Sequence, residues 1–353
     1  MNKRALRADI LLLLTAGIWG FGFVAQSSGM DYVGPFTYNG IRFILGSLSL
    51  LPLIFFQKAR RKTGAEPAQV PPGTGRGRTF RMTFIAGSVL FLAVALQQLG
   101  IIFTTVGNAG FITGFYVVLT PVFGIFLGKK TGLPTWVGMI FALGGLYFIF
   151  MAGNFKSINP GDIITVISAV FWACHILVID RLVRHIDPLV LSSGQFAWCG
   201  IYSFIAAVVL EPFVGSWARV LAPDFALQQW QTLAGLIRTI LDGGPYSGLF
   251  SAALPILYGG LASVGIAYTL QVVAQKDAPP AHATIILCLE GAFAAFGGIW
   301  LRGERLTPFS LAGFALMLCG MIITQWEMIW GKKNVSVSGS RNSPAYPEHD
   351  GGT

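Results

Sequence analysis

The chain of 353 residues carries few charges. Asp, Glu, Lys and Arg together make up 11% of it and hydrophobic residues make up 54%, whereas a typical soluble domain is about 25% charged. The mean hydropathy is +0.66. This balance excludes an ordinary soluble globular protein, because a chain with so little charge and so much apolar surface is solvated mainly by lipid.

Cysteine is also scarce. The four cysteines, Cys174, Cys199, Cys288 and Cys319, all fall inside apolar stretches and show no paired spacing. The sequence therefore predicts neither disulfide bonds nor a zinc site, and we interpret these cysteines as small core residues.

Signatures of enzymatic chemistry are missing as well. The sequence contains no Walker loop, no G-x-S-x-G nucleophile elbow, no H-E-x-x-H zinc motif and no group of carboxylates beside a phosphate cradle. We therefore expect no enzymatic activity, no cofactor and no metal ion, and we do not expect this chain to drive transport with ATP.

Long apolar stretches fill most of the chain. Ten of them approach the length of about twenty residues that a helix needs to cross a bilayer. They lie at residues 9–28, 34–56, 81–103, 107–127, 134–152, 162–180, 188–210, 251–274, 281–301 and 308–330. The predicted fold class is therefore an all-α integral membrane protein with ten transmembrane helices. The first stretch lacks a cleavage site and is interpreted as a retained helix, not a signal peptide.

The sequence contains an internal repeat. Residues 9–43 align without a gap with residues 162–196, and a second gapless register matches Gln97 with Gln271. Each copy holds five apolar stretches, and an odd number of crossings turns the second copy upside down relative to the first. The prediction is two inverted five-helix repeats, the usual architecture of alternating-access transporters, with the binding site near the bilayer midplane.

The repeats divide the chain. The first is predicted to occupy residues 1–156 and the second residues 157–331, with an extracytoplasmic insertion at about 214–250 and a disordered cytoplasmic tail at 332–353. Apolar residues recur at helical spacing in the insertion, which predicts an amphipathic helix on the outer membrane face; it either shields the pathway or only packs between helices. The basic connector at 57–80 is expected to be flexible and is a candidate for contact with anionic lipid.

The net charge of +9 follows the expected topology. With the N-terminus inside, eighteen Lys and Arg residues fall in inside segments and five fall outside. The positive-inside rule then puts both termini in the cytoplasm. The basic excess therefore gives no reason to expect a nucleic-acid partner. The expected partners are a small-molecule substrate, the lipid bilayer and, if transport is coupled, protons. Ten helices can enclose a pathway alone, so monomer and homodimer both remain open.

Several short motifs occur in a recognisable order. They are A-G-I-W-G-F at 16–21, the spacing from Pro35 to Arg42-Phe43, G-F-I-T-G at 110–114 leading to T-P-V-F at 120–123, and G-E-R-L-T at 303–307. With the ten spans and the charge bias, the chain resembles the drug/metabolite transporter superfamily, specifically its EamA-type permeases, from about residue 9 to 330. The resemblance implies a ten-helix carrier in the bacterial inner membrane, commonly an exporter of amino acids or related compounds.

Two ionisable residues lie deep inside the apolar stretches. Arg42 is placed near the midplane in the second stretch and Glu290 near the midplane in the ninth. An ionisable side chain in hydrocarbon is costly and usually faces a cavity, a partner or a substrate. Glu290 could carry a proton or bind an ammonium group, or form a structural ion pair. Arg42 could bind a carboxylate or phosphate, or brace neighbouring helices.

Aromatic and amide residues could complete a site. Trp19 and Trp172 are repeat mates in mid-helix, where they either pack in the core or contact a ligand. Tyr116, the repeat mate of Glu290, could bond a substrate or a facing helix. A further group consists of Gln97, Gln271 and His175. The two glutamines could line the two ends of a pathway or join helices, and His175 could relay protons or be a neutral core histidine.

These observations predict a secondary transporter that moves a small metabolite, an amino acid or related compound, by alternating access. Export is the expected direction, and proton coupling through Glu290 and facilitated diffusion both remain open. Two alternatives are kept. One is import of a phosphorylated or nucleotide-linked metabolite, and the other is a membrane receptor or scaffold that transports nothing.

Overall fold

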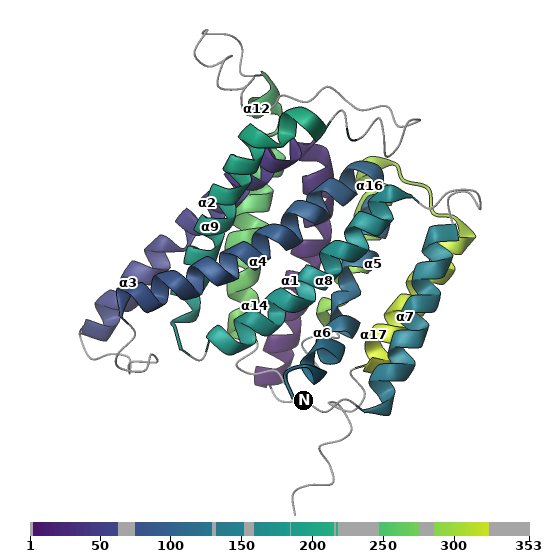
Figure 1. Cartoon of the computed structure of the whole chain (residues 1–353), viewed down its shortest axis with the longest axis horizontal. Helices are drawn as coiled ribbons and strands as arrows, with labels where there is room; N and C mark the ends of the chain where they lie inside the picture. Colours follow the sequence, from purple (N-terminus) through teal and green to yellow (C-terminus); the bar gives the residue numbers. More distant parts are fainter. Residues whose placement is uncertain are drawn as a thin grey trace, which may run out of the picture.

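The computed structural model describes residues 3–62, 75–128, 132–151, 159–183, 185–214, 217, 247–274 and 286–324. These residues are almost entirely helical (Figure 1). The helices are α1 (Lys3–Gly29), α2 (Pro35–Ser49), α3 (Leu51–Lys62), α4 (Arg76–Phe103), α5 (Val106–Gly114), α6 (Tyr116–Ile125), α7 (Leu133–Met151), α8 (Pro160–Leu182), α9 (Pro188–Val209), α12 (Ser247–Ser251), α13 (Ala253–Leu257), the π-helix η1 (Tyr258–Ala267), α14 (Tyr268–Ala274), α16 (Glu290–Arg302) and α17 (Pro308–Thr324).

Eight helical segments of the described chain are long and apolar enough to cross a membrane. They are α1, α2 with α3, α4, α5 with α6, α7, α8, α9, and α13 to α14 with η1. A shorter apolar helix of 17 residues, α17, and the 13-residue α16 follow. These segments correspond to the ten predicted stretches, and the predicted fold class is confirmed.

Some predicted boundaries were wrong. The connector expected at 57–80 is helical at both ends, because α3 continues to Lys62 and α4 already begins at Arg76. Arginine and lysine are good helix formers, and their long side chains let a helix extend past the apolar core of a bilayer. The helix expected in the 214–250 insertion and the tail at 332–353 lie largely or wholly outside the described residues.

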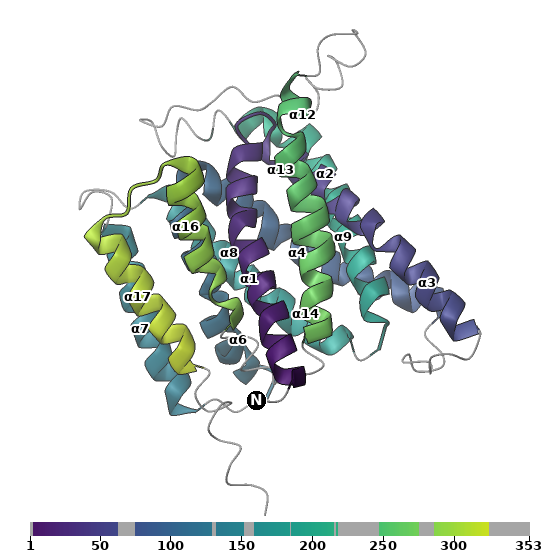
Figure 2. The ribbon, with the colours of Figure 1, turned by 180° about the vertical axis from the view of Figure 1, so that it is seen from behind.

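The two repeats are inverted in the structure. The first helix, α1, starts at the end of the bundle where the N-terminus is marked and runs to the opposite end, whereas its repeat mate α8 starts at that opposite end and runs back (Figures 1 and 2). Three pairs of repeat-related spans also pack against each other: α2 with α9, α5 of the α5–α6 span with α16, and α7 with α17. The pseudo-two-fold axis between the repeats therefore passes through these three contacts.

Small residues bring the mated helices close together. A Cβ added to Gly145 of α7 would lie 2.7 Å from the backbone oxygen of Gly313 on α17, and one added to Gly110 of α5 would lie 2.5 Å from the Cβ of Ala294 on α16. Lipid tails are as apolar as the helix surfaces, so close packing, and not exclusion of water, joins helices in a membrane.

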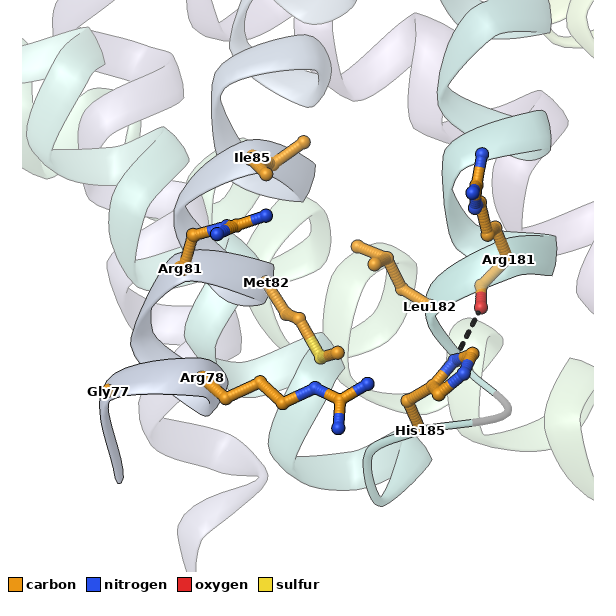
Figure 3. Close-up of a pocket in the computed structure, with 8 residues that line it drawn as sticks. All are labelled: Gly77, Arg78, Arg81, Met82, Ile85, Arg181, Leu182 and His185. Carbon is orange, nitrogen blue, oxygen red and sulfur yellow. Dashed lines mark hydrogen bonds between the residues drawn. The ribbon is translucent and has the colours of Figure 1, made fainter. Parts of the chain in front are cut away.

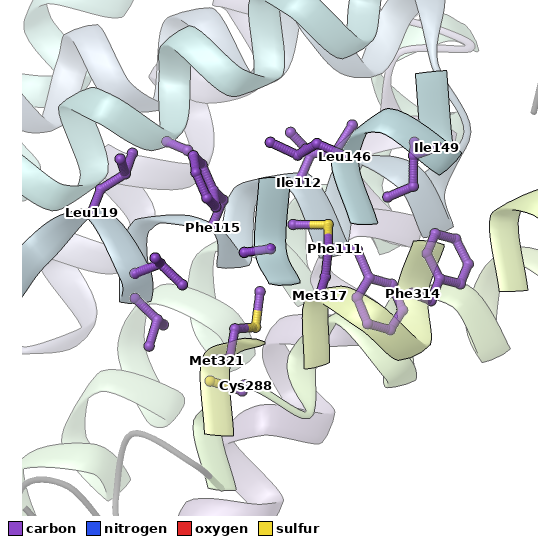
Figure 4. Close-up of a cluster of buried hydrophobic side chains, with 14 of the residues drawn as sticks. Phe111, Ile112, Phe115, Leu119, Leu146, Ile149, Cys288, Phe314, Met317 and Met321 are labelled. Atoms are coloured by element: carbon purple, nitrogen blue, oxygen red, sulfur yellow. The ribbon is translucent and has the colours of Figure 1, made fainter. Parts of the chain in front are cut away.

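A large apolar cluster surrounds the contact between α5, α6, α7 and α17 (Figure 4). The rings of Phe111 and Phe314 stack with their centroids 4.1 Å apart, and the long side chains of Met317 and Met321 fill the space beside them. This cluster holds the helix pair α7 and α17 against the rest of the bundle, on one side of the interrupted helices α5 and α6.

Candidate functional site

Two interrupted helices meet at the centre of the bundle. In the first repeat α6 begins at Tyr116, and in the second α16 begins at its repeat mate Glu290. The amide just before each start closes a tight i to i+3 turn of the same length: Phe115 N donates to Ile112 O at 3.1 Å, and Leu289 N donates to Ile286 O at 3.1 Å. The sequence had placed Tyr116 and Glu290 in mid-helix. These turns interrupt the α-helical ladder at equivalent positions, and Tyr116 still lies near the middle of the apolar span Val106–Ile125.

The two repeat mates contact each other. The Tyr116 hydroxyl donates a hydrogen bond to Glu290 Oε1 at 3.4 Å, and Glu290 is only 5% exposed. As the first residue of α16, the Glu290 carboxylate lies at the positive end of the helix dipole, which favours a negative charge there. Interrupted helices whose N-termini point at a polar group are the usual binding elements of inverted-repeat transporters.

Arg42 is the second buried charge. It is 4% exposed on α2, and its Nε donates to Asn39 Oδ1 at 2.9 Å. The guanidinium carbon also lies 4.8 Å from the ring centroid of Phe43, a cation–π contact that partly compensates for lost hydration. Among the described residues, no carboxylate lies within 4.0 Å of the guanidinium. Arg42 and Glu290 are thus two opposite buried charges that do not pair with each other.

Tyr268, the first residue of α14, connects these groups. Its ring lies 5.0 Å from that of Trp19 in an edge-on arrangement, and it is close enough to interact electrostatically with both Arg42 and Glu290. We call Trp19, Arg42, Tyr116, Tyr268 and Glu290 the central cluster. Sequence reasoning missed Tyr268. Its signal was a hydroxyl inside an apolar stretch, but several tyrosines share that signal and only the fold separates them.

The family can now be identified from comparisons with known proteins. Residues 6–151 and 159–326 match the EamA-like transporter family, with one match in each repeat. The chain belongs to the EamA-like transporter family. It is therefore a multi-pass membrane transporter, and its family gives no indication of catalysis.

Known relatives of this EamA-like transporter carry the same general description. It is 27% identical over 321 residues to an uncharacterized transporter of Archaeoglobus fulgidus, covering 91% of this chain and 86% of the relative. It is 21% identical over 316 residues to the uncharacterized transporter YoaV of Bacillus subtilis, covering 87% and 92%. A solved crystal structure is similar with a TM-score of 0.55 and 16% identity, covering 90% of this chain and 95% of the other. That likeness shows the fold alone.

The two mid-helix tryptophans of the transporter have different surroundings. Trp19 is fixed in the central cluster, because its Nε1 donates to the backbone oxygen of Ser263 in the π-helix η1 at 3.0 Å. Its repeat mate Trp172 packs against the apolar group that contains Phe43, and its buried Nε1 has no hydrogen-bond partner among the described residues. Its ring lies 5.8 Å from that of His175, and its role as a site residue stays a prediction.

Two of the three remaining predicted polar residues, Gln97 and His175, join helices. Gln97 Nε2 donates to Thr113 Oγ1 at 3.0 Å and joins α4 to α5. His175 Nε2 lies 2.8 Å from Gln195 Oε1 and joins α8 to α9. Gln271 is partly exposed on α14. The hydrogen bonds of Gln97 and His175 favour the interhelical interpretation for both residues, and a substrate or proton role for these three residues stays a prediction.

Glu304 organises the end of the bundle opposite the N-terminus. Its Oε1 accepts from Val106 N at 2.5 Å and its Oε2 accepts from Gly107 N at 3.2 Å. This carboxylate from the second repeat therefore caps α5 of the first repeat. Burial raises the pKa of Glu304 above its ordinary value, against the lowering effect of these amide hydrogen bonds. Beside it lies a small pocket of about 170 Å³ that Asp162 and Asn108 also line.

Proposed function

We propose that this EamA-like transporter is a secondary carrier that exports a small zwitterionic metabolite, an amino acid or a related compound, in exchange for protons. It works by alternating access in a bacterial inner membrane, with both termini in the cytoplasm. Trp19, Arg42, Tyr116, Tyr268 and Glu290 bind the substrate.

The separation of Arg42 and Glu290 carries this proposal. Both side chains are buried, they have opposite charges, and they do not form an ion pair with each other. An unpaired buried charge is unfavourable in hydrocarbon. An amino acid carries one carboxylate and one ammonium group, so it supplies a partner to each residue at once: its carboxylate to the guanidinium and its ammonium to Glu290.

Glu290 can couple export to protons because one carboxylate serves two competing cations. On the cytoplasmic side, ionised Glu290 binds the ammonium group of the substrate. On the outer side, a proton adds to the carboxylate, the ammonium group loses its partner and the substrate leaves. Returned to the cytoplasmic side, Glu290 releases the proton to water. One proton then enters for each substrate that leaves.

The contacts between repeat mates support alternating access. The pairs α2 with α9 and α5 with α16 meet at the pseudo-two-fold axis, and α6 and α16 both begin at the central cluster. Tilting one repeat against the other about this axis would open the cluster to either end in turn. The import of phosphorylated compounds is less well supported, because such a substrate needs at least two fixed cations and Arg42 is the one cation of the central cluster.

The test is transport by the purified full chain in proteoliposomes. Vesicles preloaded with labelled amino acids, sugars, nucleosides or quaternary amines are given an inward proton gradient, and efflux is followed against an external excess of the same compound. We expect uphill efflux of one or more amino acids and not of the other classes. No gradient-driven movement of any compound would support a receptor or scaffold instead.

Glu290→Gln separates coupling from binding. The amide cannot carry the exchanged proton, so uphill efflux should be lost while counterflow exchange of labelled for unlabelled substrate remains measurable. Tyr116→Phe is the matched control: it removes the hydrogen bond to Glu290 without removing the carboxylate, and it should slow uphill efflux without abolishing it. Uphill efflux by the Glu290→Gln variant at the wild-type rate would exclude the proton role.

A further inference from the structure

A large pocket lies between the start of α4 and the end of α8, away from the central cluster (Figure 3). Its volume is about 600 Å³, within the range of roughly 300–1,000 Å³ that sites for small molecules occupy. It is lined by Gly77, Arg78, Arg81, Met82, Ile85, Arg181, Leu182 and His185. The lining comes from both repeats, since α4 belongs to the first and α8 to the second.

The polar part of the pocket is basic. Arg78 and Arg81 come from the first two turns of α4, and Arg181 comes from the last turn of α8. All three are exposed to solvent. No aspartate or glutamate is among the described residues that line the pocket. Three guanidinium groups around one space create a positive potential that is matched by an anion with several oxygens, such as a phosphate.

The floor of the pocket is apolar. Met82, Ile85 and Leu182 lie between the two basic edges, and Figure 3 shows Met82 and Leu182 pointing toward each other across the space. Met82 continues into a buried group with Ala86, Ile186 and Leu191, against which Leu182 also packs. This floor would be of no use to a free phosphate ion, but it suits a ligand that has apolar parts next to its phosphate.

The pocket lies where membrane-spanning helices end. The start of α4 and the end of α8 are at the same end of the bundle as the start of α1 (Figure 1). Helix ends with exposed arginines above an apolar floor lie at the level of lipid headgroups, where long basic side chains reach the interface. The positive-inside rule assigns this end to the cytoplasm, the side whose leaflet attracts basic segments when it contains anionic lipid.

We propose that this pocket binds the headgroup of one anionic phospholipid. The phosphate lies among Arg78, Arg81 and Arg181, and the glycerol and the first acyl carbons lie on Met82, Ile85 and Leu182. Because its lining joins α4 of one repeat to α8 of the other, a bound lipid holds the two repeats together at this end of the bundle. The lipid therefore stabilises the particular arrangement of α4 and α8 seen in this structure.

The test measures thermal unfolding of the purified full chain in detergent as lipid is titrated. The added molecules are dioleoyl phosphatidylglycerol, dioleoyl phosphatidylcholine or inorganic phosphate. A ligand that binds the folded state raises the unfolding temperature in a saturable way. We expect saturable stabilisation by phosphatidylglycerol at a concentration at least tenfold lower than any effect of phosphatidylcholine, and no effect of inorganic phosphate at the same phosphate concentration.

Two triple variants with the same change in charge separate a site from general electrostatics. Arg78→Gln/Arg81→Gln/Arg181→Gln should weaken the response to phosphatidylglycerol at least tenfold. The control, Arg7→Gln/Lys58→Gln/Arg76→Gln, changes three exposed cations that do not line the pocket, and it should respond like the wild type. Replacing the three pocket arginines with lysine keeps the positive charge but removes the planar guanidinium groups that can bind a phosphate with two hydrogen bonds. This variant should show a response to phosphatidylglycerol between those of the wild type and the glutamine triple variant.

Three results would overturn the proposal. They are equal losses in the two glutamine triple variants, equal stabilisation by phosphatidylcholine and phosphatidylglycerol, and stabilisation by inorganic phosphate at the concentration where the lipid acts. Native mass spectrometry gives a second readout that does not depend on stability: the wild type and the control should retain one phosphatidylglycerol more than the pocket variant. Equal lipid retention by all three proteins would also exclude the site.

Discussion

The N-termini of α2 and α9 are equivalent positions in the two repeats, but different residues accept the hydrogen bonds of their first amides. In α9, the N-cap residue Asp187 accepts hydrogen bonds from Leu189 N at 2.9 Å and Val190 N at 3.4 Å. In α2, the N-cap is Gly34 and has no side chain to offer. Glu211, from the other repeat, takes its place.

Glu211 reproduces the local cap from a distance. Its Oε1 accepts from the amides of Phe36 and Thr37, both at 3.0 Å, and its Oε2 accepts from the Thr37 hydroxyl at 2.6 Å. These amides are the repeat equivalents of those that Asp187 caps in α9. Both helix starts therefore have a carboxylate acceptor for their amides, but in α9 it comes from the adjacent N-cap residue and in α2 it comes from the other repeat.

The same asymmetry runs through the centre of the molecule. Tyr116 and Glu290 are repeat mates, yet one is a hydrogen-bond donor and the other a carboxylate. Arg42 is matched in the second repeat by Gln195, which bonds His175. An inverted repeat therefore supplies equivalent backbone positions, while the differing side chains give the site two opposite charges.

The largest effect is expected at the cap of α2. Glu211→Ala leaves two buried amides and one buried hydroxyl without their acceptor, which should lower the free energy of unfolding by about 3 kcal/mol. Adding Gly34→Asp should restore part of this loss, because Gly34 has the extended backbone of an N-cap. The atoms nearest a Cβ there belong to the Glu211 side chain that Ala removes. Thermal and denaturant unfolding of the single and double variants measures the effect.

If adding Gly34→Asp to Glu211→Ala restored no stability, the role of Glu211 as the cap of α2 would be contradicted. Gly34→Asp alone is the control. With Glu211 present, the new side chain would overlap the existing carboxylate, so the single variant should be less stable than the wild type. If it were neutral, the cap of α2 would have to be more adaptable than the structure indicates.

Arg42→Gln makes the first repeat match the second at this position. We expect kcat/KM for a carboxylate-bearing substrate to fall about 100-fold, since losing one partner of a buried charge pair costs about 2–5 kcal/mol. Arg42→Lys should recover only part of the activity, because it keeps the charge and loses the bidentate geometry. Initial transport rates in proteoliposomes measure kcat/KM for each variant. An esterified substrate that lacks the carboxylate should be affected much less.

The paired glycines of α7 give a matched test of helix contact. A Cβ on Gly145 would lie 2.5 Å from Met317 Cγ and 2.7 Å from Gly313 O on α17, whereas one on Gly144 meets nothing within 4 Å. Gly145→Ala should therefore lower the free energy of unfolding by about 2 kcal/mol. Gly144→Ala should be neutral or stabilising by less than about 1 kcal/mol. Equal unfolding temperatures for the two variants would mean that α7 and α17 pack less closely than described.

The smallest effect is expected for Gln97. Gln97→Leu removes one hydrogen bond between α4 and α5, and such bonds in membranes are worth about 0.6 kcal/mol on average. A double-mutant cycle with Thr113→Val isolates that contribution in unfolding measurements. Transport should remain near the wild-type rate. A loss of transport without a loss of stability would instead support the predicted contact with substrate.

Much of the fold could be predicted from the sequence, and much less of the site. The length of each apolar stretch predicts a membrane-spanning helix, and the odd number of such helices in each repeat predicts that the two repeats are inverted. The pairing of Tyr116 with Glu290 was suggested by the repeat register, but their contact was not, because repeat mates touch only where the symmetry axis passes. Tyr268 and Glu211 gave no distinctive signal. Each contacts a residue more than 150 positions away in the chain, Glu211 at Phe36 and Tyr268 at Trp19, and local patterns carry no information about such distances.

The sequence by itself determined that this chain crosses a membrane several times in two inverted halves, because the apolar length of a helix and the parity of its crossings are properties of consecutive residues. Only the tertiary structure decided that Arg42 and Glu290 remain unpaired near one tyrosine, that Glu211 caps a helix of the other repeat, and that three arginines surround one pocket. Those facts depend on which helices pack together, and in lipid that is decided by the fit of whole helix surfaces to one another.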